Sequence, residues 1–133
     1  MKPRNISTVS SIKSRTALPT PSAILEMYPL SDSLADQVAM HRTQVQNIID
    51  GSDPRKLLIV GPCSAWPNEA VLEYSAQMHE IAEKVKEQIM VVLRCYIQKP
   101  RTTVGWAGPI TQPDPFEAPN IEKGIQYCRS MML

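Results

Sequence analysis

Two short apolar segments with almost no polar alternation constrain the fold of this chain most strongly. The first covers residues 56–60, and the second covers residues 89–97 and is interrupted only by Arg94. Strands that are buried on both faces have this composition, which is typical of parallel sheets. A helical pattern lies between the two segments. The chain therefore predicts an α/β fold with a strand–helix–strand unit and a right-handed crossover.

Three amphipathic helices are expected around these strands. Ser33 is the expected cap of the first helix, with Asp36 three residues later as in a capping box, and Gly51 stands where its C-terminal cap belongs. Asn68 is the expected cap of the second helix, which connects the strands, and Asn120 caps the third. The predicted order is helix, strand, helix, strand, long loop and helix.

The part of the chain before the first of these helices has a different character. Residues 1–30 are rich in proline and have little periodicity, and we expect an N-terminal arm there, followed by one folded domain over residues 31–133. Residues 6–16 are rich in Ser and Thr, carry basic residues and no acid, and leave an organellar transit peptide as the alternative to an arm.

Composition narrows the class of protein and its compartment. The chain is 43% apolar and 20% charged, which is typical of a soluble globular protein. Its formal net charge of +1 gives no indication of a nucleic-acid or membrane partner, and we expect neither. The three cysteines have no metal-binding spacing and are an odd number, which favours a reducing, cytoplasmic compartment.

Positive charge is concentrated at the end of the second apolar segment. Arg94, Lys99 and Arg101 lie within eight positions, and no acidic residue occurs between Glu87 and Asp114. A guanidinium inside an apolar strand is costly unless it is paired, so Arg94 predicts an anionic partner. The alternative is that Arg94 pairs with a carboxylate elsewhere and that the loop charges are solvated.

The loop after Arg94 has the donors that a phosphate group requires. Thr102 and Thr103 add hydroxyl groups to the cations, and Pro100 restricts the directions in which its two cationic neighbours point. Ligands of parallel β/α folds bind at the carboxyl ends of the strands. The loop therefore predicts a phosphate-binding element of a β/α enzyme.

Cys63 follows the first apolar segment after a Gly-Pro turn that should project it into the same strand-end region. A small buried hydrophobic residue and a thiolate ligand for a transition metal both remain open for it. Trp66 and Trp106 stand in the two strand-end loops, where each either packs or walls the site. The other candidate ligands are expected to be structural or solvated, namely Cys95, Cys128, His41 and His79.

Two motifs at these strand ends resemble one enzyme family. Gly-Pro-Cys-Ser at residues 61–64 and Lys-Pro-Arg-Thr-Thr-Val-Gly-Trp at residues 99–106 are similar to the class I 3-deoxy-D-arabino-heptulosonate 7-phosphate (DAHP) synthases. The related 3-deoxy-octulosonate 8-phosphate synthases share a Gly-Pro-Cys turn but not the Lys-Pro-Arg-Thr-Thr loop. The resemblance implies a TIM (β/α)8 barrel, the substrates phosphoenolpyruvate and erythrose 4-phosphate, and the first step of the shikimate pathway. It also implies a homo-oligomeric enzyme.

The resemblance further implies a role for each matching residue. Cys63 would be a metal ligand, and the metal would be a divalent ion such as Mn, Fe, Co or Zn. Lys99 and Arg94 would be the catalytic pair that holds phosphoenolpyruvate, with Lys99 also close to the reacting carbonyl. Arg101 and Thr102 would bind the phosphate of erythrose 4-phosphate.

Two features depart from the family pattern. Residues 65–67 read Ala-Trp-Pro, whereas the family usually continues with Ile-His-Asp after its first motif. A TIM barrel needs eight βα units and about 250 residues, and this chain carries two predicted strands. We therefore expect the N-terminal segment of an incomplete barrel, about two βα units with an arm and a helix before them, inactive on its own. The alternative is a non-catalytic remnant that acts as a regulatory or interaction piece.

Overall fold

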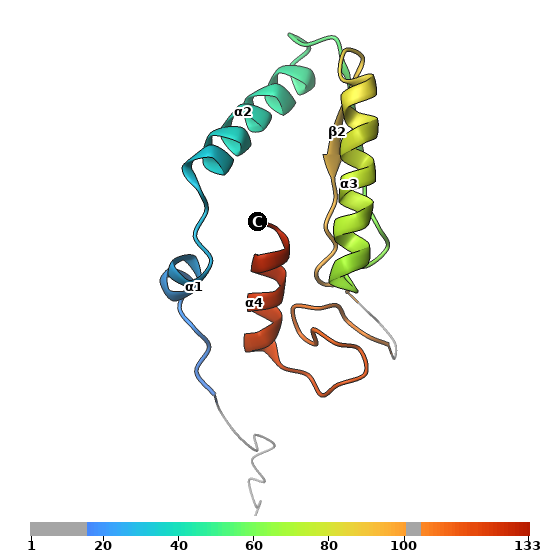
Figure 1. The fold of residues 1–133 in the computed structure, drawn as a ribbon. Helices are drawn as coiled ribbons and strands as arrows, with labels where there is room; N and C mark the ends of the chain where they lie inside the picture. Colours follow the sequence, from blue (N-terminus) through green and yellow to red (C-terminus); the bar gives the residue numbers. More distant parts are fainter. Residues whose placement is uncertain (1–15, 101–104) are drawn as a thin grey trace, which may run out of the picture.

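The structure, a computed structural model, describes residues 16–100 and 105–133. Two parallel strands form its sheet, and the helix that connects them runs along one side of the sheet (Figure 1). The strands pair from Lys56 opposite Ile89 to Val60 opposite Leu93. The predicted strand–helix–strand unit is confirmed. In chain order the elements are α1 (Pro21–Met27), α2 (Asp32–Ile49), β1 (Lys56–Val60), α3 (Asn68–Val85), β2 (Ile89–Leu93) and α4 (Ile121–Met131).

Helix α2 begins two residues earlier than the sequence predicts. Its cap is Ser31, which has an extended backbone and whose hydroxyl oxygen accepts a hydrogen bond from the Leu34 amide at 3.3 Å. The prediction of Ser33 as the cap is wrong, because Ser33 lies inside the first turn, with its hydroxyl oxygen 3.1 Å from that of Ser31. Gly51, expected at the C-terminal cap, follows the helix with a φ of 84°, in the left-handed region.

The predictions for the starts of α3 and α4 have opposite outcomes. Pro67 takes the cap position of α3, and no side chain caps that helix. The prediction of Asn68 as a cap is wrong, because Asn68 is already the first helical residue, and its buried Oδ1 has no hydrogen-bond partner within the described part of the chain. At α4 the prediction is confirmed, since Asn120 Oδ1 accepts from the Lys123 amide at 3.0 Å.

The region expected to be an arm contains a short helix, α1. Thr20 caps it through a hydrogen bond to its side-chain oxygen from the Ala23 amide at 3.2 Å, and Ile24 is its buried residue. Arg129 on α4 donates to the Tyr28 carbonyl just after α1, at 3.2 Å from Nε and 3.0 Å from Nη2. Helix α4 therefore lies between α1 and α3, as Figure 1 shows.

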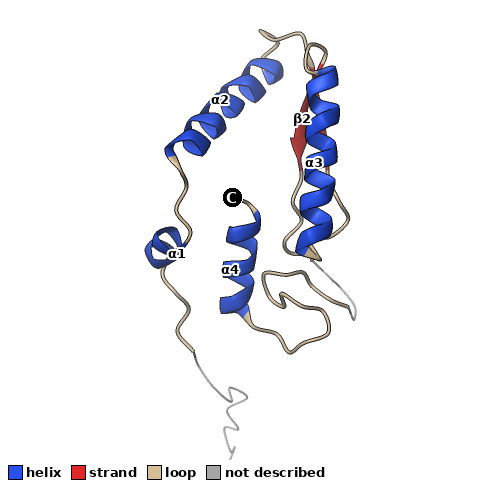
Figure 2. Ribbon diagram, in the orientation of Figure 1, coloured by secondary structure: helices blue, strands red, loops and turns tan. Residues whose placement is uncertain are grey.

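Strand β2 ends at Leu93 instead of Ile97, so the prediction that Arg94 lies inside a strand is wrong. The reason is the length of the partner strand. Strand β1 ends at Val60, and the last bond of the pair runs from the Arg94 amide to the Val60 carbonyl at 2.7 Å. Beyond that point Gly61 and the proline after it turn the chain away. Residues 94–100 and 105–120 contain no helix or strand (Figure 2).

The buried cluster lies beyond the carboxyl ends of the strands, between α3 and α4. Its centre is formed by Ala65, Val71 and Met131. Helix α4 packs closely on the long loop, because a Cβ on Gly124 would collide with the Ile110 carbonyl oxygen. This packing fixes the loops that follow both strands. The partly buried residues packed against the cluster are Cys95, Ile97 and Tyr127.

Burial of both strand faces, which the apolar composition predicts, is not found for β1. Leu58 and Ile59 are 44% and 62% exposed, although they point to opposite faces. The described helices do not cover both faces of a sheet of two strands, and the prediction fails for that reason. None of the helices in residues 16–100 and 105–133 is long and apolar enough to cross a membrane.

Candidate active site

The loops that follow β1 and β2 form a depression of about 300 Å³ at the carboxyl ends of the strands. The sequence predicts a site at this edge, and the structure brings Cys63, Arg94 and Lys99 together there. They come from segments more than thirty positions apart in the chain and meet because parallel strands end on the same side of a sheet. The residues that line the depression are Cys63, Arg94, Tyr96, Lys99 and Pro100.

Arg94 is held against the turn that follows β1. Its Nη2 donates to the Gly61 carbonyl at 3.3 Å and to the Pro62 carbonyl at 2.9 Å. A Cβ on Gly61 would collide with the Arg94 carbonyl oxygen, so only glycine lets the two backbones approach this closely. Arg94 is exposed and is bonded to carbonyl dipoles. The prediction that it needs an anion because it is buried is therefore wrong.

The alternative prediction, that Arg94 pairs with a carboxylate elsewhere, is also wrong for the described residues. Within residues 16–100 and 105–133 the ion pairs join Arg55 to Asp53 and Lys86 to Glu83, and neither includes Arg94 or Lys99. The charges of both cations are thus not neutralised by carboxylates of the described chain. They remain available to a ligand.

Lys99 reaches across the depression to Cys63. Its Nζ donates to the Cys63 Sγ at 3.1 Å. Cys63 is exposed, so its alternative reading as a small buried hydrophobic residue is wrong. The hydrogen bond from Lys99 and the charge of its ammonium lower the pKa of the Cys63 thiol, and the Ser64 hydroxyl and the charge of Arg94 act in the same direction. The thiolate, which is the nucleophilic and metal-binding form, is therefore favoured.

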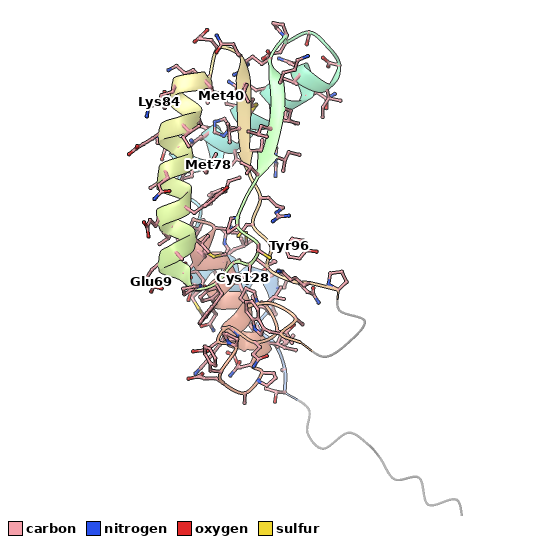
Figure 3. All side chains as sticks on the ribbon, turned by 90° about the vertical axis from the view of Figure 1, so that its right-hand side faces the viewer. Met40, Glu69, Met78, Lys84, Tyr96 and Cys128 are labelled. Atoms are coloured by element: carbon pink, nitrogen blue, oxygen red, sulfur yellow. The ribbon has the colours of Figure 1, made fainter. Side chains whose placement is uncertain are left out.

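Tyr96 is the residue of the depression that sequence reasoning missed. Its ring centroid lies 5.3 Å from Arg94 Cζ and 5.6 Å from Lys99 Nζ. Figure 3 shows Tyr96 beyond the ends of the strands, projecting away from α3. Tyr96 could have been predicted from the alternation of side chains between the two sides of an extended segment. Cys95 and Ile97 pack on the core, so Tyr96 and Arg94 belong to the opposite side.

The remaining predicted residues have separate outcomes. Arg101 and Thr102 lie outside the described residues. Trp66 packs in an aromatic cluster, with its ring centroid 6.3 Å from that of Trp106 and 5.9 Å from that of Phe116, both edge to face. The Trp106 indole also donates to the Gln112 carbonyl at 2.8 Å. These contacts are those of packing side chains.

The other cysteines and histidines lie outside the depression. Burial raises the pKa of Cys95, and burial raises that of Cys128 to about 11, as expected of structural thiols. His41 and His79 are exposed and line a larger groove between α2, α3 and β2. The described residues contain no group of three His, Cys, Asp or Glu side chains that could hold a metal ion.

Parallel strands joined by a crossover helix, with a cationic depression at their carboxyl ends, define an α/β protein of the kind that binds its ligand at the strand ends. A more specific assignment comes from the family model of the DAHP synthetase I family, which matches residues 31–128. The chain belongs to that family.

Individual relatives agree with this assignment. The chain is 36% identical over 117 residues, or 88% of its length, to the Trp-sensitive phospho-2-dehydro-3-deoxyheptonate aldolase of Salmonella typhi, and covers 34% of that protein. It is 38% identical over 122 residues to the Tyr-sensitive aldolase of Escherichia coli, covering 92% of this chain and 34% of that protein.

A solved structure has the same arrangement. The phospho-2-dehydro-3-deoxyheptonate aldolase of Francisella tularensis superposes with a TM-score of 0.86 at 35% identity, covering 91% of this chain and 36% of that one. The chain thus spans about a third of the length of the relatives that it matches.

Proposed function

We propose that this chain contributes to the condensation of phosphoenolpyruvate with erythrose 4-phosphate, which gives DAHP and phosphate in the first step of the shikimate pathway. Membership of the family and the names of the relatives support the reaction. One observation on the chain itself carries the proposal. Arg94 and Lys99, neither paired with a carboxylate of the described residues, line one depression together with Cys63.

The proposal includes the architecture around this chain. Strand β1, helix α3 and strand β2, followed by α4, would be the first two βα units of a (β/α)8 barrel, with the domain spanning residues 31–133 here and residues 1–30 preceding it. The likeness to the Francisella tularensis enzyme supports this. We also propose a homo-oligomer in the cytoplasm, where the three free cysteines would stay reduced.

The two described cations suit the two anionic groups of phosphoenolpyruvate. A guanidinium offers a planar fork that matches a carboxylate or phosphate, and an ammonium acts as a compact point charge. In the proposed site Arg94 and Lys99 hold the phosphate and carboxylate of this substrate. Lys99 would also donate a hydrogen bond at the reacting carbonyl. Arg101 and Thr102 would bind the phosphate of erythrose 4-phosphate.

A divalent metal fits the chemistry of Cys63 as one ligand among several. The Cys63 thiol is exposed at the depression, and its neighbouring cations lower its pKa, so that the ligating thiolate is available. Transition metals with borderline or soft character accept such a ligand. A bound metal would polarise the aldehyde carbonyl of erythrose 4-phosphate as a Lewis acid.

The test uses a hybrid enzyme in which residues 31–128 replace the matching segment of the Salmonella typhi relative, and compares Lys99→Ala, Arg101→Ala and the control Lys84→Ala. Each charge-assisted contact is worth about 1.5–3 kcal/mol, or about ten- to a hundredfold. Arg101→Ala should lower kcat/KM for erythrose 4-phosphate by that factor, and Lys99→Ala should depress kcat. Lys84 lies in the last turn of α3, so its variant should keep wild-type parameters. Unchanged kinetics in both site variants would refute the proposal.

A further inference from the structure

We propose that Tyr96 is a positioning residue whose ring holds the cations of Arg94 and Lys99 in the arrangement that binds phosphoenolpyruvate. The inference rests on the proposed function of the site and adds a third residue to it. Tyr96 does not need to touch the substrate in this role. It acts through the two side chains that do.

The geometry of the ring carries the inference. Arg94 Cζ and Lys99 Nζ are 5.3 Å and 5.6 Å from the centroid of the Tyr96 ring. A cation within about 6 Å of an aromatic centroid is attracted by the negative face of the ring. One ring therefore interacts with both cations of the depression that the structure describes.

Two like charges that share a small depression repel each other, so something must hold them in place. Each cation also donates hydrogen bonds to the segment after β1. Arg94 donates to the carbonyls of Gly61 and Pro62, and Lys99 donates to Cys63. A carboxylate between the cations would hold them more strongly, but it would also neutralise them and compete with an anionic ligand. An aromatic ring attracts both cations and leaves their full positive charge available.

The ring is itself held by the core. The flanking residues Cys95 and Ile97 pack against the buried cluster, and the Tyr96 carbonyl accepts a hydrogen bond from the Ala65 amide at 3.4 Å. The backbone on both sides of Tyr96 is thus fixed by packing on the face opposite the depression. The ring therefore offers a defined surface to two long, flexible side chains, and it reduces the side-chain entropy that they lose when a ligand binds.

The test compares Tyr96→Leu, which removes the ring face, with Tyr96→Phe, which keeps it. Binding of phosphoenolpyruvate is measured by calorimetry on the 133-residue chain, and steady-state kinetics are measured on the hybrid enzyme. Cation–π contacts at exposed sites, about 0.5–1 kcal/mol for each cation, predict affinity about five- to thirtyfold weaker for Tyr96→Leu. In the hybrid this appears as a higher KM for phosphoenolpyruvate with little change in KM for erythrose 4-phosphate, and kcat falls as well, because Lys99 also donates at the reacting carbonyl. Tyr96→Phe should stay within about threefold of wild type, because phenylalanine also accepts cations.

An Arg94→Ala variant distinguishes a failure of the role proposed for Tyr96 from a failure of the proposed function of the site. If Arg94→Ala loses phosphoenolpyruvate binding and Tyr96→Leu does not, the inference is overturned and the proposed function stands. If both variants bind like wild type, the proposed function itself falls. Equal losses in Tyr96→Phe and Tyr96→Leu would assign the effect to the hydroxyl group and also overturn the inference. A rise in both KM values in Tyr96→Leu would indicate a structural role and would overturn it as well.

Discussion

Replacing Gly61 by alanine tests how closely the end of β1 approaches Arg94. An ideal Cβ at Gly61 would collide with the Arg94 carbonyl oxygen and would lie 2.9 Å from its carbonyl carbon and 3.1 Å from its Cβ. Backbone atoms cannot move aside as the end of a flexible side chain can. The Arg94 backbone must therefore shift away from β1.

The cost has two parts. Overpacking of a well-packed position costs about 1–3 kcal/mol. The shift also weakens the hydrogen bond from the Arg94 amide to the Val60 carbonyl, 2.7 Å long, and a bond of this kind is worth about 0.5–1.5 kcal/mol. Gly61→Ala should therefore lower the free energy of unfolding by about 1.5–4.5 kcal/mol. With an m-value of about 2 kcal/mol/M in urea, the midpoint falls by about 1–2 M.

The assay is urea unfolding of the chain followed by far-UV circular dichroism, with Gly51→Asn as the matched control. Gly51 has no neighbouring atom within 4 Å and a φ of +84°, a conformation that asparagine tolerates. The control carries only the cost of a positive φ, about 1 kcal/mol, which is less than the cost expected for Gly61→Ala. A midpoint for Gly61→Ala equal to that of wild type would refute the close approach of the two segments.

Three further predictions follow from single contacts. Lys99→Met should raise the pH midpoint of Cys63 alkylation by iodoacetamide in the metal-free chain, because the hydrogen bond and the charge of Lys99 lower the pKa of that thiol. Alkylation is followed by peptide mass spectrometry, and an unchanged midpoint would contradict the prediction. Asn120→Ala should cost about 1 kcal/mol in urea unfolding through loss of the α4 cap, whereas Asn68→Ala, which removes no cap, should be near neutral; equal losses would contradict the assignment. Arg129→Met removes two donors to the carbonyl just after α1 and should speed proteolytic cleavage between α1 and α2, and an unchanged cleavage rate would exclude this role.

The sequence could predict that residues from the two strand-end loops meet in one site, because their meeting depends on topology alone. Two apolar segments joined by a helix predict parallel strands, and the ends of parallel strands lie together whatever the details of packing. Cys63 and Lys99, 36 positions apart, meet at 3.1 Å for that reason. The functional roles of these residues remain predictions, since contacts within the chain do not identify a ligand.

The predictions of the α2 cap and of the end of β2 were wrong because the local sequence allows more than one boundary, and the tertiary structure selects between them. Ser31 and Ser33 both satisfy the rule for a helix cap, and the rule itself does not choose between them. The end of β2 failed for a related reason. Apolar residues continue to Ile97, but a strand ends where its partner ends, and β1 stops at Val60. Later residues of the apolar segment pack on the core from an extended loop.

The error over Arg94 bears on the nature of the site. The sequence predicts an anionic partner for Arg94, because a buried guanidinium must be paired. In the structure Arg94 is exposed and donates to carbonyl oxygens. Carbonyl dipoles and the ring of Tyr96 orient the guanidinium without cancelling its charge. Burial of the Arg94 guanidinium beside a carboxylate would have stabilised the fold and neutralised the charge. An oriented but unneutralised cation is instead suited to an anion that must bind and leave, which is what a substrate does.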